Sequence, residues 1–358
     1  MKVVHIAPTY FDESSVIGGG ERYPTELSSW MSKLVDTTLV SFSTRRQTYR
    51  QDRLKIELYP VKQFIHGNKV NPLAFRYVQS LRGADVVHIH HIHTLVSDLG
   101  CLAGSVLGKR VFVTDYGGGG SLTLNRRLPV FPAYQNAIAY SQFGLEMLPA
   151  GLKEKAILIR GGIDIGKFCP NGIGSREKKI LYVGRILPHK GIDYLIAGFR
   201  LLNRTDYRLR ILGRVQNGTY LRDLRQLAMG LSVDFIHDAD DQRLVNEYRT
   251  ARVTVLPSVH TTSDGMYTSV PELMGFTLLE SQACGTPVVC TNAGAMPEFV
   301  DDNSTGIVVP QNSASAIAAA LRETIHWEEP LRQKRCREWV EGLNWESVAA
   351  RHVAAYNC

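Results

Sequence analysis

The sequence of 358 residues predicts an α/β protein with two doubly wound, Rossmann-like domains. Its length allows about two domains of ordinary size. Short β-branched runs alternate with amphipathic segments, which is typical of parallel sheets covered on both faces. This alternation starts again after Arg160, and the stretch 161–175 is rich in glycine and proline, as in a hinge. We therefore expect an N-terminal domain at 1–165, a second domain at 166–340 and a C-terminal helix segment at 341–358 that could pack back on the first domain.

In the first series, strands are short apolar or β-branched runs, and a helix is expected where apolar residues recur every three or four positions. Such a helix is predicted at 21–34. The expected strands lie at 3–7, 38–42, 56–59, 85–89 and 111–113.

The second series follows the same pattern. Its expected strands lie at 179–183, 209–212, 233–236, 253–256 and 287–290, and its helices at 193–202, 220–229, 276–283 and 345–356. Open parallel sheets bind ligands beyond the carboxyl ends of their strands, so polar residues that follow strands are the candidates for a site.

Composition excludes several classes of protein. With 44% hydrophobic and 21% charged residues, the chain is an ordinary globular one. It contains neither an apolar run long enough to span a membrane nor the apolar core of a signal peptide. The six cysteines form no C-x-x-C pair, which argues against disulfides or a zinc site and favours the cytoplasm.

Charge is uneven along the chain. Residues 1–165 hold 19 basic and 13 acidic side chains, a balance of +6, whereas residues 166–358 hold 22 and 21, a balance of +1. A basic half indicates an anionic substrate, a membrane surface or nucleic acid, or simply a soluble surface.

The richest stretch for chemistry is Pro271–Glu280, in which seven residues separate Glu272 from Glu280. Gly275 interrupts it, and a helix is expected from Phe276. The N–H groups and partial positive charge at a helix N-terminus suit a phosphate. Glu280, one turn inside, can accept hydrogen bonds from a pair of sugar hydroxyls, and Glu272 can reach another part of the ligand. The alternative is two surface glutamates at a helix start.

A second candidate group follows the strand at 179–183. Arg185 projects from the carboxyl end of this strand, and Lys190 lies on the next loop. Two cations five residues apart can bracket a diphosphate and neutralise a leaving group. The alternative is a pair of ordinary surface cations.

Two further motifs come from the first half. Gly18-Gly19-Gly20 precedes a helix and permits close backbone approach to a ligand, although it is not the dinucleotide-binding G-x-G-x-x-G pattern. His88 and His90 point to the same face of a strand, and His91 and His93 follow. Clustered histidines can bind metal, but no nearby cysteine or acidic pair completes a site, so we expect no metal.

Together, these motifs resemble one family. The Glu–seven residues–Glu stretch closely resembles that of retaining GT-B glycosyltransferases, above all glycosyltransferase family 4. The continuation, Cys284–Val289 and then Gly294–Glu298, is similar as well. The resemblance covers nearly the whole chain. It implies the GT-B fold, in which two Rossmann-like domains face each other across a cleft.

The resemblance also implies an activity: transfer, with retention, of a hexose-type sugar from a nucleotide-diphosphate sugar to an unidentified acceptor. A UDP-sugar is favoured over a GDP-sugar. The catalytic residues implied are His90, near the transferred sugar, and Glu272, on its hydroxyls. The residues implied to bind the nucleotide sugar are Gly19, Arg185, Lys190, Gly275, Phe276, Thr277 and Glu280.

The sequence departs from the family pattern in three places. Asp115-Tyr116 is followed by four glycines where the family often has His-Gly or His-Asp, so the acceptor is not transferable from the family. The segment 259–270 is longer than usual and is expected to be either a flap over the sugar or a surface excursion. At the end of the strand 233–236, His237 replaces the glycine usual where the family reads the base.

We expect no cofactor and no nucleic acid. The acceptor is expected to be anionic or lipid-linked, with possible peripheral contact at the inner membrane face. Two other functions stay open: a GT-B relative such as a nucleotide-sugar epimerase or phosphorylase, and a non-catalytic binding partner in a glycan assembly complex.

Overall fold

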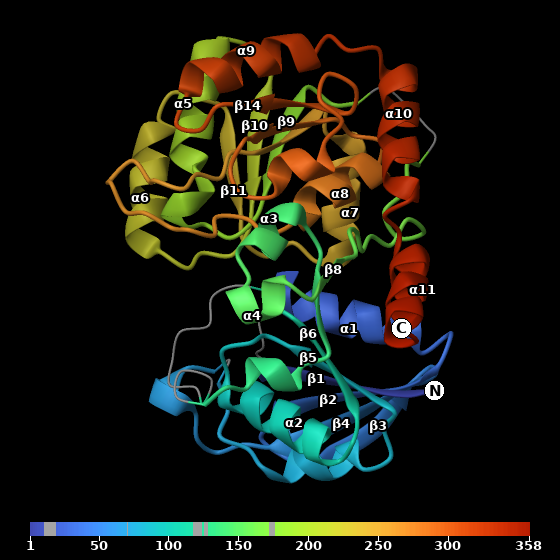
Figure 1. Ribbon diagram of the computed structural model, residues 1–358. Helices are drawn as coiled ribbons and strands as arrows, with labels where there is room; N and C mark the ends of the chain where they lie inside the picture. The colour runs from blue at the N-terminus through green and yellow to red at the C-terminus, as the bar shows by residue number, and fades with distance from the viewer. Residues whose placement is uncertain (11–18, 70, 117–123, 125–127, 172–175) are drawn as a thin grey trace. The chain divides into compact units, whose positions relative to one another are not determined.

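The computed structural model describes residues 1–10, 19–69, 71–116, 124, 128–171 and 176–358 (Figure 1). It divides into two compact units. The first unit comprises Met1–Gly162 together with Trp345–Cys358, and the second unit comprises Ile163–Asn344. Among the described residues, no helix combines the length and the apolar character that crossing a bilayer requires.

The first unit contains an eight-stranded sheet in the order β3-β4-β2-β1-β5-β6-β7-β8. All neighbouring strands are parallel except β3 and β4. The strands are β1 (Lys2–Tyr10), β2 (Asp36–Ser43), β3 (Gln47–Gln51), β4 (Leu54–Pro60), β5 (Val86–His90), β6 (Arg110–Thr114), β7 (Asn136–Ala139) and β8 (Ala156–Leu158).

Helices cover this sheet because alternate side chains of its inner strands are apolar on both faces. Val4 and Ile6 of β1 enter a large core that includes α2 residues, and the neighbouring residue His5 contacts α1 on the other face. Helix α11 packs against α1. The helices are α1 (Gly19–Met31), α2 (Leu95–Val106), α3 (Gln142–Glu146), α4 (Ala150–Lys153) and α11 (Trp345–Tyr356).

The second unit contains a six-stranded, fully parallel sheet in the order β11-β10-β9-β12-β13-β14. Its strands are β9 (Lys179–Val183), β10 (Arg208–Leu212), β11 (Val233–Ile236), β12 (Val253–Leu256), β13 (Val288–Thr291) and β14 (Gly306–Val309). Its helices are α5 (Ile192–Leu202), α6 (Gly218–Leu227), α7 (Asp241–Thr250), α8 (Phe276–Ala283), α9 (Ala314–Thr324) and α10 (Glu329–Glu341).

The prediction of two parallel α/β sheets is confirmed. The sequence analysis did not assign the short strands β3, β7, β8 and β14, nor the helices α2, α3, α4, α7, α9 and α10. Strand β3 is exposed along its whole length, so it has no apolar pattern to detect. Helix α10 is strongly polar, with only Cys336 and Val340 buried, and its face pattern is correspondingly weak.

Each sheet reverses its strand order at one point. In the first unit this switch point lies between β1 and β5, and in the second unit it lies between β9 and β12. At such a point the connections leave in opposite directions, which opens a crevice beyond the carboxyl ends of the two strands. The predicted site residues fall at these two positions, and each is described within its own unit below.

Candidate functional site

In the second unit, an ion pair spans the switch point. Lys190 ends the 3₁₀ turn Pro188–Lys190, which follows β9, and its ammonium contacts Glu272 Oε1 on the segment after β12. The exposed fractions of the two side chains are only 8% and 16%. The structure therefore joins two residues that the sequence had suggested for different parts of a ligand.

One backbone and one side-chain hydrogen bond hold Glu272 in place. The Ala295 N–H donates to the Glu272 carbonyl oxygen at 3.0 Å, and the Ser258 hydroxyl donates to Oε1 at 3.4 Å. Gly294 adopts φ +57°, and a Cβ there would lie 2.1 Å from the same carbonyl oxygen. Only glycine fits this conformation and this space. The segment Gly294–Glu298, singled out in the sequence, thus supports the Glu272 loop.

Arg185 differs from Lys190 in being exposed. Its guanidinium lies 3.5 Å from Gln216 Oε1, at the limit of a hydrogen bond. The turn beneath it is firmly held, because the buried Tyr182 hydroxyl donates to the Arg185 carbonyl oxygen at 3.0 Å. Burial raises the pKa of Tyr182 well above its usual value, so this hydroxyl remains a donor. The Arg185 guanidinium is therefore accessible to an anion, whereas its backbone is held in place by the hydrogen bond from Tyr182.

Helix α8 begins close to this turn. Gly275 is its N-cap residue, has φ +82°, and provides no side chain to cap the first turn. The Thr277 hydroxyl donates to the Val183 carbonyl oxygen at 3.1 Å, which ties the first turn of α8 to the end of β9. The positive end of the helix, including Phe276, is therefore placed beside the loop that carries Arg185.

Glu280 lies one turn into α8 and is 5% exposed. The hydroxyl of Tyr248, on α7, donates to its Oε2 at 2.8 Å. Tyr248 is fully buried, and the sequence analysis gave it no role because α7 itself was not assigned.

The long segment 259–270 is an ordered excursion. A bridge pairs Thr261 with Tyr267, and His260 Nδ1 donates to the Thr268 carbonyl oxygen at 2.9 Å. Met266 and Tyr267 near its tip are 56% and 71% exposed. The segment therefore has the conformation of a small hairpin with an apolar tip; whether it covers a sugar stays a prediction.

His237 follows β11. Its Nδ1–H donates to the Gly213 carbonyl oxygen at 3.0 Å, which leaves Nε2 as an acceptor. That nitrogen is buried and has no hydrogen-bond partner in the described structure.

The first unit places its candidates at the other switch point. Gly19 is the first residue of α1, after β1, and His90 is the last residue of β5. Gly18 and the four glycines after Tyr116 lie outside the described residues. His91, the residue directly after His90, has φ +76°, a left-handed backbone conformation that is uncommon for residues other than glycine.

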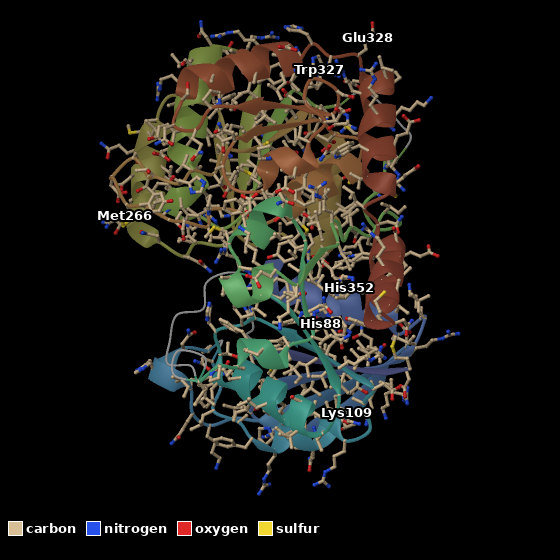
Figure 2. The ribbon with its side chains drawn as sticks, in the orientation of Figure 1. His88, Lys109, Met266, Trp327, Glu328 and His352 are labelled. Atoms are coloured by element: carbon tan, nitrogen blue, oxygen red, sulfur yellow. The ribbon has the colours of Figure 1, made fainter. Side chains whose placement is uncertain are left out.

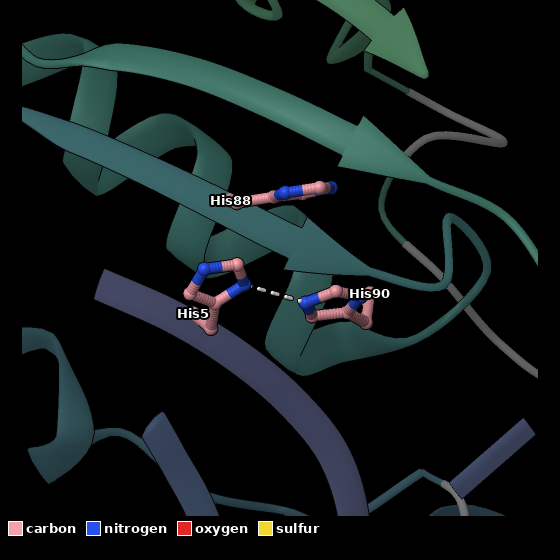
Figure 3. Close-up of side chains that lie close together, drawn as sticks. All are labelled: His5, His88 and His90. Atoms are coloured by element: carbon pink, nitrogen blue, oxygen red, sulfur yellow. Dashed lines mark hydrogen bonds between the residues drawn. The ribbon is translucent and has the colours of Figure 1, made fainter. Parts of the chain in front are cut away.

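His90 belongs to a buried histidine cluster that consists of His5, His88 and His90 (Figure 3). His5 on β1 is the register partner of His88 on β5, and His90 lies two residues further on the same face. His5 Nδ1 and His90 Nε2 are 2.9 Å apart. The sequence analysis missed His5, although strand parity within a β1–β5 pair would have identified it.

The groups at the two ends of this chain of hydrogen bonds determine which ring nitrogens carry a proton. His5 Nε2 lies 3.2 Å from Met31 Sδ, which only accepts, so His5 Nε2 carries the hydrogen. His5 Nδ1 then accepts from His90 Nε2–H. His90 Nδ1 in turn accepts from the Tyr116 hydroxyl at 2.6 Å. Both ring nitrogens of His90 are therefore occupied by protein partners in this conformation.

The cluster is uncharged near neutral pH. Burial lowers the pKa of His5 to about 3, with a smaller effect of His352. Burial, and then neighbouring histidines, hold the pKa values of His88 and His90 well below the usual value. Burial also lowers the pKa of His352, on α11, to about 4. His352 stacks on His88 with ring centroids 5.8 Å apart. Figure 2 labels both residues.

Neutral imidazoles are the form that binds metal, and one ligand nitrogen from each of the three histidines lies within 4.8 Å of the others. Each ring nitrogen, however, already has a protein contact. His88 contacts the hydroxyls of Tyr356 and Thr114, and the other two histidines are occupied as described. A metal would have to displace these partners, so the arrangement resembles a hydrogen-bonded core more than a vacant metal site.

Comparison with known sequences shows which proteins the second unit is similar to. Residues 167–341 match the family described as glycosyl transferases group 1. An uncharacterized glycosyltransferase of Methanocaldococcus jannaschii is 32% identical over 190 residues, which cover 52% of this chain and 46% of that protein. The D-inositol 3-phosphate glycosyltransferase of Kribbella flavida is 32% identical over 226 residues, which cover 56% of this chain and 50% of that protein. The chain thus spans about half the length of the curated relatives it matches.

Solved structures match over the whole chain. Sucrose-phosphate synthase from Thermosynechococcus elongatus superposes with a TM-score of 0.72 at 19% identity, covering 99% of this chain and 98% of that one. Anabaena HepE, solved with UDP and glucose, has a TM-score of 0.73 at 16% identity, covering 100% and 99%. The fold is that of GT-B glycosyltransferases. The match of residues 167–341 to the group 1 glycosyl transferase family confirms the resemblance at that level.

Proposed function

We propose that the protein is a retaining glycosyltransferase that moves a hexose-type sugar from a nucleotide-diphosphate sugar to an acceptor hydroxyl. One observation carries the proposal: the Lys190–Glu272 ion pair lies beside the N-terminal turn of α8, within the segment that matches the group 1 family. This arrangement offers positive charge to a diphosphate and a carboxylate to a sugar at one switch point.

The diphosphate would be held by two cations and a helix N-terminus. Exposed Arg185 makes the first approach to the phosphates, and Lys190 neutralises the charge that grows on the leaving group. The backbone at Gly275, Phe276 and Thr277 adds N–H donors at the positive end of α8. No step in this scheme requires a divalent metal.

The sugars would be held by carboxylates. Glu280 accepts hydrogen bonds from the ribose hydroxyls, and Glu272 accepts them from the transferred sugar. From the first unit, Gly19 approaches the diphosphate and His90 acts next to the transferred sugar. Because both nitrogens of His90 have partners, this role requires that the Tyr116 hydroxyl or the His5 ring releases one of them.

Transfer would proceed on one face of the sugar. The bond between the anomeric carbon and the β-phosphate oxygen breaks, and the acceptor oxygen bonds to the same face of that carbon. The acceptor proton passes to the departing phosphate, so the products are the glycoside and the nucleoside diphosphate. Lys190 and Arg185 stabilise the leaving group as its negative charge develops.

UDP is the proposed nucleotide, with GDP as its competitor. HepE, which shares the fold, was solved with UDP and with UDP-glucose, which supports this choice by analogy. The acceptor nitrogen of His237, which has no partner among the described residues, is suited to an N–H of the base, and both uracil and guanine present one.

The proposed acceptor is anionic or lipid-linked. The basic balance of residues 1–165 supports this, and Arg50 and Arg53 near strand β3 are exposed. Exposed basic residues attract anionic lipid surfaces. The proposed place of action is the cytoplasm, with peripheral contact at the inner membrane face.

A thermal-shift screen across nucleoside diphosphates and nucleotide sugars tests the proposal, since a bound ligand raises the apparent stability. We expect the largest shifts with UDP and a UDP-sugar. A donor-hydrolysis assay without acceptor separates the alternatives: an epimerase isomerises the donor, a phosphorylase requires inorganic phosphate, and a non-catalytic partner leaves the donor intact even with acceptor. No shift with any nucleotide would overturn the proposal.

A further inference from the structure

A buried tyrosine supports the carboxylate proposed to hold the ribose. The Tyr248 hydroxyl donates to Glu280 Oε2 at 2.8 Å, and both residues are buried. A hydrogen bond from a neutral donor leaves the carboxylate its full negative charge while fixing the direction in which it points. A cation in the same place would instead compete with ligand hydroxyls for that charge.

Tyr248 is itself rigidly held. Its ring packs edge-on against Phe168 with centroids 6.1 Å apart. Its carbonyl oxygen accepts hydrogen bonds from the Thr286 hydroxyl at 2.5 Å and from the Arg176 guanidinium at 3.4 Å. Burial and the neighbouring Glu280 charge raise the pKa of Tyr248 well above its usual value. The phenol therefore stays protonated and donates at any working pH.

We propose that Tyr248 is a positioning residue for ribose recognition: its hydroxyl holds the Glu280 carboxylate in the orientation that accepts the 2′- and 3′-hydroxyls of a nucleoside diphosphate. The inference rests on the proposed function, because it assigns Tyr248 to the same nucleotide site. It goes beyond that function by giving α7, which carries no proposed ligand contact, a part in nucleotide selectivity. A loosely held carboxylate would lose affinity for the ribose and not for the phosphates.

The test compares UDP with 2′,3′-dideoxy-UDP by calorimetry on the full chain. In wild type, UDP is expected to bind more tightly, because only UDP offers hydroxyls to Glu280. Tyr248→Phe keeps the ring and removes the donor. We expect it to weaken UDP binding by about tenfold, the lower end for a hydrogen bond to a charged group, and to change dideoxy-UDP binding less than about twofold.

A double-mutant cycle keeps the test independent of folding. Glu280→Gln should also reduce the preference for UDP, and adding Tyr248→Phe to it should change that preference little further, because the two residues act through one contact. Tyr59→Phe is the matched control. Tyr59 is a buried tyrosine of the first unit whose hydroxyl donates to Glu57 Oε2 at 3.1 Å, on a strand with no proposed ligand contact. It should lower the melting temperature without altering the UDP preference.

Two results would overturn the inference. In the first, Tyr248→Phe weakens UDP and dideoxy-UDP equally, which marks a purely structural role. In the second, Tyr248→Phe leaves the preference for UDP intact while Glu280→Gln abolishes it. A wild-type protein that binds neither nucleotide would instead refute the nucleotide function itself, and the Tyr248 role would fall with it.

Discussion

The two switch points have opposite electrostatic characters. In the first unit, the strands β1 and β5 bring together His5, His88 and His90, which are buried, uncharged and hydrogen-bonded to neighbouring groups. In the second unit, the loops after β9 and β12 bring together Lys190 and Glu272, which are nearly as buried but form an ion pair. The same topological position thus carries a neutral network in one unit and paired charges in the other.

This difference determines how each region tolerates change. A neutral network loses hydrogen bonds when one member is removed, but it leaves no charge behind. Removal of one partner from a buried ion pair leaves the other charge buried without a partner. This lowers the free energy of unfolding far more than the loss of neutral hydrogen bonds does. The paired charges can also bind a charged ligand, because a diphosphate can contact Lys190 while sugar hydroxyls donate hydrogen bonds to Glu272. We therefore expect binding energy to depend mainly on the second unit.

The largest effect is expected for Lys190→Ala. Loss of the ammonium should weaken UDP binding about 10- to 100-fold and reduce turnover with it. The stranded Glu272 carboxylate should also lower the free energy of unfolding by about 3 kcal/mol. Calorimetry, turnover and urea unfolding measure the three quantities. In the control Lys190→Ala/Glu272→Gln, stability should recover while UDP affinity stays low; if affinity also recovered, Lys190 would serve only to neutralise Glu272.

His90→Ala should separate turnover from binding. The proposed partner of His90 is the transferred sugar, so the loss should appear in turnover, about 10- to 100-fold, with UDP affinity nearly unchanged. Turnover with a working acceptor is measured beside UDP calorimetry. Equal losses in both would make His90 structural or part of the phosphate site. Full turnover would shift the role to His88, His91 or His93.

Acid should destabilise the first unit through its histidines. An unfolded histidine takes up a proton near pH 6.5, whereas His5 and His352 do so only at about 3 and about 4 when folded. Between these values the unfolded chain binds more protons, so stability falls as pH falls below 6.5 and is unaffected above it. Each such histidine contributes about 1.4 kcal/mol per pH unit.

Urea unfolding between pH 5 and pH 8 measures this slope, above the range in which carboxylates titrate. His352→Phe is the comparison variant, because its Nδ1–H bonds only the Val348 carbonyl oxygen and its Nε2 has no hydrogen-bond partner among the described residues. Its unfolding free energy should depend less steeply on pH. A wild-type stability that stays flat down to pH 5 would contradict the neutral cluster.

Much of this comparison could be predicted from sequence, and the missing part has a physical reason. Periodicity located the strands β9, β11 and β12 and the helix α8 at their observed bounds. A glycine or proline directly borders β9, β12 and α8 and marks one end of each. The Glu–seven residues–Glu spacing singled out Glu272 and Glu280, whose roles stay predictions. The pairing of Lys190 with Glu272 was not visible, because it depends on the order of strands in the sheet.

Two supporting residues were missed for the same reason. His5 lies in an ordinary apolar strand, and it joins His88 and His90 only because β1 and β5 are neighbours. Tyr248 lies on α7, a mostly polar helix with few buried residues, so no pattern distinguished it. Local sequence indicates which residues can carry chemistry, whereas their partners are set by contacts between segments far apart in the chain.

The contrast in net charge between the two halves of the chain predicts an effect on lipid binding that is smaller than the effects of the substitutions above. Arg50→Glu/Arg53→Glu should reduce sedimentation with anionic vesicles, since each basic residue near such a surface contributes about 1 kcal/mol. The control is Lys334→Glu/Arg335→Glu on α10, which changes the net charge equally at exposed positions of the second unit. Equal recovery of wild type with neutral and anionic vesicles would leave a soluble acceptor.

The smallest effect is expected for removal of divalent metal, which should leave the affinity for UDP unchanged. The proposed diphosphate site uses Arg185, Lys190 and the start of α8, so Mg²⁺ or Mn²⁺ has no charge left to neutralise there. UDP calorimetry in EDTA and in excess Mg²⁺ should therefore give affinities within about twofold, well below the tenfold that 1.4 kcal/mol represents. Binding only with metal would refute the cationic site.

A Zn²⁺ titration in the absence of UDP tests the other switch point. Each ring nitrogen of His5, His88 and His90 is already hydrogen-bonded, so we expect only weak uptake of Zn²⁺ by the wild type and the same weak uptake by His5→Phe. If tight, stoichiometric uptake disappears in that variant, the first unit carries a metal site, and the contrast between a neutral and a charged switch point no longer holds.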